Sequence, residues 1–193
     1  MTREALRAAA ERLFDERGAD GVSVRAVADE VGTTTRAVYS LFGSREGLLI
    51  DSLAERAYEL LDRGLTTLPE TDDPAGDLIE AGVTVFRPFV REHPSLFRIA
   101  FQRVAPDLEP GPQLVAARAR AFDRLVEKIR RLEAAGQLGE KAPTEALIEF
   151  QALCEGLGNL ELRGDTMRLL PSNQEETTWR AAFTTLVRGF AAR

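Results

Sequence analysis

The chain has 193 residues, of which 44% are hydrophobic and 29% charged, and its net charge is -6. These values are ordinary for a soluble globular protein. No apolar run is long enough to cross a bilayer and the N-terminal segment does not resemble a secretory signal, so we expect a cytoplasmic protein. Its one cysteine, Cys154, excludes an internal disulfide and fits a reducing compartment.

The charge is unevenly distributed. Residues 1–45 contain seven arginines and seven acidic residues, so this segment is neutral and the rest of the chain carries the whole net charge. A neutral N-terminal segment is compatible with DNA binding if its arginines gather on one face.

Apolar residues recur at helical spacing almost throughout, and no stretch alternates like a strand, so the sequence predicts an all-α fold of about nine helices. They are expected at about 2–17, 24–31, 35–42, 45–65, 76–92, 95–103, 113–135, 144–163 and 176–192. Ser23, Thr34 and Ser44 are the predicted N-caps of the second, third and fourth helices. Pro88 lies inside the fifth and predicts a kink there.

The two short helices separated by Gly32 describe a helix-turn-helix unit after the first helix. In such a unit the third helix lies in the major groove of DNA and presents polar side chains to it. The face of this helix opposite Val38 and Phe42 carries Thr34, Thr35, Arg36, Tyr39 and Ser40.

Residues 21–32, 33–42 and 43–48 together closely resemble the DNA-binding domain of the TetR family. The shared pattern is a second helix bounded by alanine and glycine, a tyrosine three residues before a phenylalanine, and a small-residue turn followed by a basic residue, Glu and Leu. The resemblance implies a homodimer on a pseudo-palindromic operator, released when a small molecule binds the C-terminal domain. It divides the chain into a DNA-binding domain, residues 1–46, and a ligand-binding and dimerisation domain, residues 47–193, with helix 45–65 connecting them.

The resemblance also implies which residues contact DNA. Ser23, Tyr39 and Arg45 would bind phosphate, with Arg45 replacing the lysine usual in the family, and Arg25 would bind phosphate or a base. Leu41 stands where the family often has an aromatic residue or histidine. The whole expected DNA-binding set is Ser23, Arg25, Thr34, Thr35, Arg36, Tyr39, Ser40 and Arg45.

Segments 92–98 and 150–162 resemble, more weakly, a subgroup of family sensor domains with a His-Pro turn. Phe150 and Glu155 replace a tryptophan and a histidine usual in that subgroup. The resemblance to the subgroup therefore does not indicate which ligand this chain binds. The candidate pocket residues are Phe86, Phe89, His93, Phe97, Phe101, Phe122, Phe150 and Cys154. Core packing is the alternative for the phenylalanines and for Cys154, and ending a helix before Pro94 is the alternative for His93.

The last two long helices carry apolar stripes that suit either the core or a dimer seam. In the family, the corresponding helices pair with their copies as a four-helix bundle. The residues expected at a dimer interface are Leu153, Leu157, Leu160, Trp179, Phe183, Leu186, Val187 and Phe190.

Catalysis finds little support in the sequence. Di-iron chemistry in a helical bundle needs two Glu-x-x-His pairs, and the chain has one histidine. Nucleophile-elbow, phosphate-loop, zinc-cysteine and dinucleotide-binding motifs are absent from the sequence. We therefore expect no catalytic residue, metal or cofactor, and as partners operator DNA, an unidentified small-molecule effector and a second copy, but no membrane. A ligand-responsive activator and a helical-bundle enzyme are the alternatives to a repressor.

Overall fold

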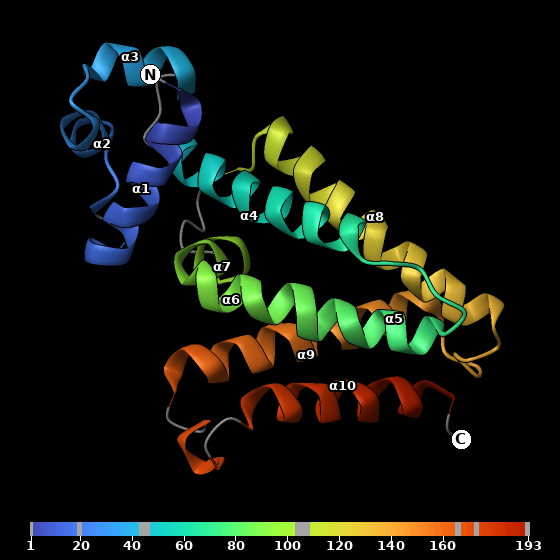
Figure 1. Ribbon diagram of the computed structural model, residues 1–193. Helices are drawn as coiled ribbons and strands as arrows, with labels where there is room; N and C mark the ends of the chain where they lie inside the picture. The colour runs from blue at the N-terminus through green and yellow to red at the C-terminus, as the bar shows by residue number, and fades with distance from the viewer. Residues whose placement is uncertain are drawn as a thin grey trace. The chain divides into compact units, whose positions relative to one another are not determined.

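The computed structural model describes residues 2–18, 21–42, 47–102, 109–164, 167–171 and 174–191. No strand occurs among these residues, and the all-α prediction is confirmed. The helices in chain order (Figure 1) are α1 (Arg3–Arg17), α2 (Val24–Val31), α3 (Thr35–Phe42), α4 (Gly47–Thr67), α5 (Pro74–Glu80), the π-helix η2 (Ala81–Phe86), α6 (Arg87–Glu92), α7 (Pro94–Phe101), α8 (Pro112–Ala134), α9 (Pro143–Arg163), the 3-10 helix η3 (Met167–Leu169) and α10 (Glu175–Ala191). The expected start of the fourth helix at Arg45, capped by Ser44, lies outside the described residues.

The chain divides into two compact units. One comprises Met1–Glu59 and His93–Ala119, and the other comprises Leu60–Glu92 and Arg120–Arg193. This division groups the first part of α4 and all of α7 with α1–α3, whereas the sequence predicts a domain boundary near residue 46. That residues 1–46 form a domain of their own stays a prediction.

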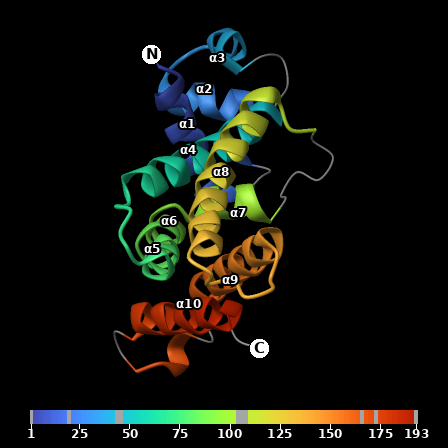
Figure 2. The same ribbon diagram turned by 90° about the vertical axis from the view of Figure 1, so that its right-hand side faces the viewer.

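In the first unit, α1 contacts α2 and α7, and α2 contacts α3. The three N-terminal helices lie together in both views (Figures 1 and 2). Their apolar faces meet in a core whose most buried members are Leu6, Ala9, Ala10, Leu13, Val27, Ala28 and Val38. Because these faces point inward, the polar faces of α2 and α3 are left toward solvent.

In the second unit, α10 packs against α9, α5 and η2, and α6 packs against α9. α9 and α10 lie side by side in both views (Figures 1 and 2). The ring centroids of Phe150 and Phe183 are 5.0 Å apart and those of Trp179 and Phe183 are 6.0 Å apart. These rings are at most 1% exposed, so they form the centre of this unit's core.

α5, η2 and α6 follow one another without a break over residues 74–92. If α5, η2 and α6 are counted as one helix, the described residues form nine helices, not including the short η3. The Arg87 N–H donates to the Gly82 carbonyl five residues earlier, which is the π-helical pattern. Pro88, which has no N–H to donate, follows directly. The irregularity expected at Pro88 therefore takes the form of a π-helix over the six residues before Arg87.

Candidate functional site

The turn between α2 and α3 is fixed by Gly32. This residue has φ 69° and ψ 41°, in the left-handed region that glycine adopts without steric cost. The Gly32 N–H donates to the carbonyls of Ala28 and Asp29, and the Thr33 N–H donates to the Ala28 carbonyl at 2.8 Å. This is the hydrogen-bond pattern of a Schellman motif, which ends α2 sharply at Val31 and lets α3 start at Thr35, after three intervening residues.

Both helices begin with the side-chain caps predicted from the sequence. Ser23 Oγ accepts the Ala26 N–H at 3.1 Å, and Thr34 Oγ1 accepts the Ala37 N–H at 3.2 Å. Each cap satisfies one of the N–H groups that a helix leaves unpaired at its start. The two predicted caps are confirmed.

The face of α3 opposite the core is polar and exposed. Val38 and Phe42 are buried, whereas the exposed residues of this face are Thr34, Thr35, Arg36, Tyr39 and Ser40. The Ser40 hydroxyl donates to the Ala37 carbonyl at 2.8 Å and keeps its oxygen as an acceptor. Within the described residues, Arg36 forms no ion pair, so its guanidinium can bind an external acceptor.

The arginines of the N-terminal segment do not all gather on this face. Arg25 is exposed and lies 4.0 Å from Asp29, one turn further along α2. Arg12 pairs with Glu30 at 3.3 Å. Arg3 and Arg7 are bound to α4, and Arg45 lies outside the described residues. Arg17, at the end of α1, is exposed and lies 3.8 Å from Glu16. On the helix-turn-helix pair itself, Arg25 of α2 and Arg36 of α3 are therefore the arginines that suit contact with DNA.

Arg7 belongs to a buried polar network that could not be predicted from the sequence. Its Nε donates to Ser52 Oγ at 2.6 Å, and its terminal nitrogens donate to Glu55 at 2.5 Å and Glu59 at 3.2 Å. The Arg3 guanidinium also binds Glu55, at 3.2 Å, and lies over the Phe42 ring. The pairing of α1 with α4 thus depends on residues about 50 positions apart, which helical periodicity does not reveal.

The His-Pro turn contacts α1. His93 Nδ1 lies 3.1 Å from a Glu11 carboxylate oxygen, and the Ser95 hydroxyl donates to the Asp15 carboxylate. His93 also immediately precedes α7, whose first residue is Pro94. Both contacts join α1 to the start of α7 within the first unit.

The expected pocket residues are distributed over both units. Phe86, Phe89, Phe122, Phe150 and Cys154 belong to the second unit, and His93, Phe97 and Phe101 belong to the first. His93, Phe101 and Phe122 are half-buried, and the other five are buried. Burial raises the pKa of the Cys154 thiol well above its ordinary value, and the charge of Glu155 adds to this. A thiol held protonated is a weak nucleophile, which favours the packing interpretation of Cys154.

The residues expected at a dimer seam also divide into two groups. Leu157, Trp179, Phe183, Val187 and Phe190 are buried within the protomer itself. Leu153, Leu160 and Leu186 are half-buried, and Ile148 of α9 is 67% exposed. A seam on these helices would therefore use the second group rather than the first.

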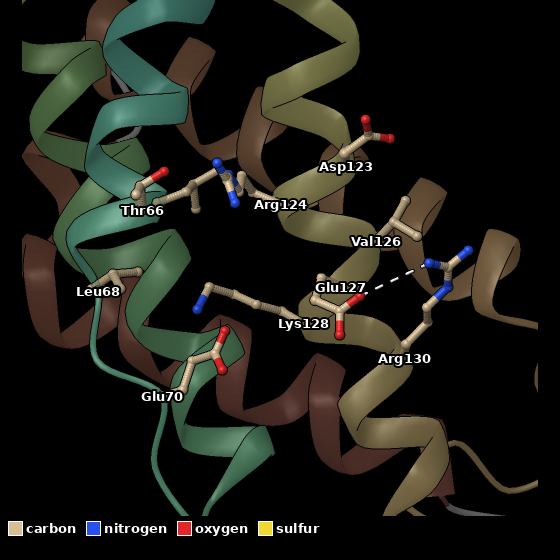
Figure 3. A pocket seen from close by; sticks show the side chains of 10 residues that line it. Thr66, Leu68, Glu70, Asp123, Arg124, Val126, Glu127, Lys128 and Arg130 are labelled. Carbon is tan, nitrogen blue, oxygen red and sulfur yellow. Dashed lines mark ion pairs between the residues drawn. The ribbon is translucent and has the colours of Figure 1, made fainter.

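A hollow of about 520 Å³ lies in the second unit, and we call it the α8 hollow (Figure 3). It is lined by Leu65, Thr66, Leu68, Glu70, Asp123, Arg124, Val126, Glu127, Lys128 and Arg130. These residues come from the end of α4, the segment after it and the middle of α8. Ligand pockets commonly measure about 300–1,000 Å³. None of the pocket residues expected from the sequence lines this hollow.

Within the described residues, no group of three or more His, Cys, Asp or Glu side chains is arranged to hold a metal ion. In that same part of the chain, no helix is both long and apolar enough to span a membrane.

The capped α2–turn–α3 unit, with a buried apolar face and an exposed polar face on α3, defines a helix-turn-helix DNA-binding protein. Residues 6–51 match the family model described as bacterial regulatory proteins of the tetR family. Residues 78–186, more than half of the chain, match a Tetracyclin repressor-like C-terminal domain. The chain belongs to the TetR family of transcriptional regulators, as the resemblance in its first 48 residues implied. No curated protein sequence matches it significantly.

Solved structures of similar fold cover nearly the whole chain. A protein of unknown function from Rhodococcus sp. RHA1 is 25% identical, with a TM-score of 0.81 over 98% of this chain and 95% of that one. The TetR family transcriptional regulator PfmR from Thermus thermophilus is 22% identical, with a TM-score of 0.72 over 97% of this chain and 96% of that one. A TetR variant from Acinetobacter baumannii AYE, solved in complex with minocycline, is 22% identical, with a TM-score of 0.65 over 98% and 96%.

Proposed function

We propose that the protein is a homodimeric repressor that binds a pseudo-palindromic operator through α3 and leaves it when a small molecule binds the helical C-terminal part. The observation that carries this proposal is the exposed polar face of α3, held by buried Val38 and Phe42 directly after the Gly32 turn. Such a face has no role in packing the protomer, and its side chains are those that contact base edges and phosphates.

The individual residues suit different contacts. The Arg36 guanidinium can bind the O6 and N7 acceptors of guanine through two hydrogen bonds. Tyr39, which is 41% exposed, has a hydroxyl that can reach a phosphate. Ser23 and Thr34 stand at helix N-termini, where exposed N–H groups favour a phosphate. Arg25, Arg45, Thr35 and Ser40 complete the proposed set.

A dimer is needed to bind two half-sites, which lie about 34–36 Å apart on one face of the duplex. The exposed Ile148 and the half-buried Leu153, Leu160 and Leu186 supply apolar surface on α9 and α10 that the protomer does not cover fully. We place the dimer seam there, on the two helices that the family resemblance implies.

Release by a small molecule requires that the ligand favour a form of the dimer with the wrong spacing of the two α3 helices. A coupling free energy of about 1–3 kcal/mol is typical of such linkage. α4 is the element that would transmit the change, because Arg7 binds its first part to α1 through Ser52, Glu55 and Glu59. The TetR variant of similar fold that was solved in complex with minocycline supports the ligand-binding part of the proposal.

The test is binding of the purified protein to DNA flanking its own gene, compared with scrambled DNA over a range of salt concentrations. Arg36→Ala and Tyr39→Ala should each weaken operator binding by about 1–3 kcal/mol, because each removes a contact to a base or phosphate. Arg188→Ala removes the same charge from an exposed position on α10 and serves as the matched control. It should leave operator affinity nearly unchanged.

Weak binding that does not depend on DNA sequence, or equal losses for Arg36→Ala and Arg188→Ala, would contradict the proposed role of α3. Equal losses would mean that net charge alone, rather than the α3 face, determines the affinity.

A further inference from the structure

We propose that the α8 hollow binds a small organic acid, with its anionic group at Lys128 and its apolar part against Leu65, Leu68 and Val126. The role of this acid as an effector rests on the proposed function, whereas its binding does not.

The first observation is the burial of Lys128. This residue is only 4% exposed, although lysine is rarely buried without a partner. Within the described residues, its ammonium forms no hydrogen bond or ion pair. Figure 3 shows the side chain extending from α8 toward Leu68 and Glu70, on the segment that follows α4. Because Lys128 lines the hollow, its ammonium is within reach of a ligand there, and a bound anion would give it an ion-pair partner.

The second observation is that none of the described carboxylates lining the hollow forms an ion pair with Lys128. Asp62 binds Arg124 at 3.1 Å, and Glu127 lies 3.9 Å from Arg130. The pKa of Arg131 is raised chiefly by its hydrogen bond with Asp77, and the charge of Glu70 adds to this. Glu70 is thus close enough to Arg131 to act on it, and it forms no ion pair with Lys128. Asp123, the remaining acidic residue of the lining, points away from Lys128 in Figure 3.

A second cation points into the same space. Arg124 lies one helical turn before Lys128, and Figure 3 shows both side chains directed from α8 toward α4 and the segment after it. The Asp62 contact uses Arg124 Nε, which leaves the two terminal nitrogens of the guanidinium for a ligand. Like charges one turn apart repel each other, and an anion between them removes this repulsion.

The third observation is the size and lining of the hollow. A volume of about 520 Å³ is far larger than a single carboxylate or phosphate needs. Leu65, Leu68 and Val126 give it apolar walls, so the ligand that fits both parts is an acid with an apolar group attached.

The sequence contains two lysines, Lys128 and Lys141, which makes a direct test possible. In protein labelled with ¹³C only in lysine, nuclear magnetic resonance gives one side-chain signal set for each. Lys141, ion-paired with Glu149 at 2.5 Å, is the internal control. The probes are benzoate, its neutral isostere benzamide and inorganic phosphate, at constant ionic strength. The signals are assigned with Lys128→Arg and Lys141→Arg.

Benzoate should shift the Lys128 signal saturably and leave the Lys141 signal in place, and benzamide should have no effect. Phosphate should act more weakly than benzoate, because it has no apolar part. Lys128→Met, which keeps an unbranched side chain but is one atom shorter and uncharged, should fold normally by circular dichroism and lose the thermal stabilisation that benzoate gives the wild type. Arg124→Gln should weaken that stabilisation several-fold. Equal shifts of both lysines, or equal effects of benzoate and benzamide, would overturn the proposal.

Adding benzoate to the operator complex separates this inference from the proposed function. If the Lys128 signal responds while operator binding does not change, the acid site is supported and its effector role is wrong. If sequence-selective DNA binding is found while the Lys128 signal does not respond, the acid site is wrong and the DNA-binding function stands.

Discussion

Replacing Arg7 by methionine should destabilise the first unit far more than replacing Arg3 by methionine, although both arginines bind Glu55. The Arg7 side chain is 8% exposed, and it donates to Ser52, Glu55 and Glu59. Removing one partner of a fully buried ion pair costs about 3–5 kcal/mol. After Arg7→Met, Glu55 still has its ion pair with Arg3, and the Glu59 side chain, which is 33% exposed, can be hydrated instead. We therefore expect Arg7→Met to lower the free energy of unfolding by about 2–3 kcal/mol.

The Arg3 side chain is 43% exposed, and its ion pair and its contact with the Phe42 ring are each worth about 1 kcal/mol or less. Arg3→Met should therefore cost about 1 kcal/mol. For a chain of this size, about 1 kcal/mol changes Tm by about 2–4 °C. Denaturant unfolding followed by circular dichroism measures the two free energies directly. If Arg7→Met and Arg3→Met are equally stable, the buried network contributes nothing and α1 is held to α4 by apolar packing alone.

Substitutions at three further positions test other parts of the structure. Gly32→Ala should cost about 1–2 kcal/mol, because alanine resists the left-handed conformation, and Gly32→Asn should cost less in the same denaturant titration. Gly82→Ala should lower the stability measured by thermal unfolding by about 1–2 kcal/mol, because the alanine Cβ would clash with the buried Phe183 ring. This clash exceeds the gain in helix propensity. A variant more stable than wild type would contradict the packing described. Asp77→Asn should cost about 1–3 kcal/mol at neutral pH, and the difference from wild type should shrink in acid.

The acid dependence at Asp77 follows from the direction of its pKa shift. Burial alone would raise the pKa of Asp77, but hydrogen bonds from Thr71 and Arg131 and the charge of Arg131 outweigh it and lower the pKa. The folded state therefore binds this proton more weakly than the unfolded state does. The stabilisation is complete above the ordinary value of 3.8 and is lost as the pH falls through the lowered pKa. A difference between variant and wild type that stays constant into acid would refute this account.

Asp51 should behave in the opposite way. Its pKa is raised, mainly by burial and further by the charge of Glu55, against the hydrogen bond from the Gly111 N–H. Its ionised form therefore lowers the stability of the fold at neutral pH, and protonation relieves this as the pH falls through the raised pKa. Asp51→Asn keeps an acceptor for Gly111 and should be more stable than wild type at neutral pH, with no gain in acid. A loss of stability at neutral pH would show that the carboxylate itself is required.

Local signals in the sequence were enough to predict the helices and the exposed face of α3. Ser23, Gly32 and Thr34 act within one helical turn of their own positions, so their roles follow from residue type and spacing. Val38, Leu41 and Phe42 were predicted to form the apolar side of α3. Val38 and Phe42 are buried as expected, whereas Leu41 is 37% exposed.

The features that were not predicted depend on residues distant in sequence. In the sequence, Arg7 cannot be distinguished from a surface arginine. Only the fold shows that Glu55 and Glu59 lie beside it. Lys128 lies on a helix rich in arginine, and sequence spacing alone does not show that its side chain is buried and directed toward the segment that follows α4. Phe183 and Trp179 suited both a core and a dimer seam, because periodicity shows which face of a helix is apolar but not what covers it.

The π-helix η2 determines the direction in which the side chains that follow it point around the helix axis. An α-helix advances by about 100° for each residue, so one extra residue accommodated in a wide turn displaces every later side chain around the axis. Before η2 the helix packs on α10, and after it α6 packs on α9 and Arg87 binds Glu161 at 3.1 Å. Regular winding through residues 81–86 would carry Arg87 around the axis and away from Glu161. The number of residues in this segment therefore determines which side chains of α6 reach α9.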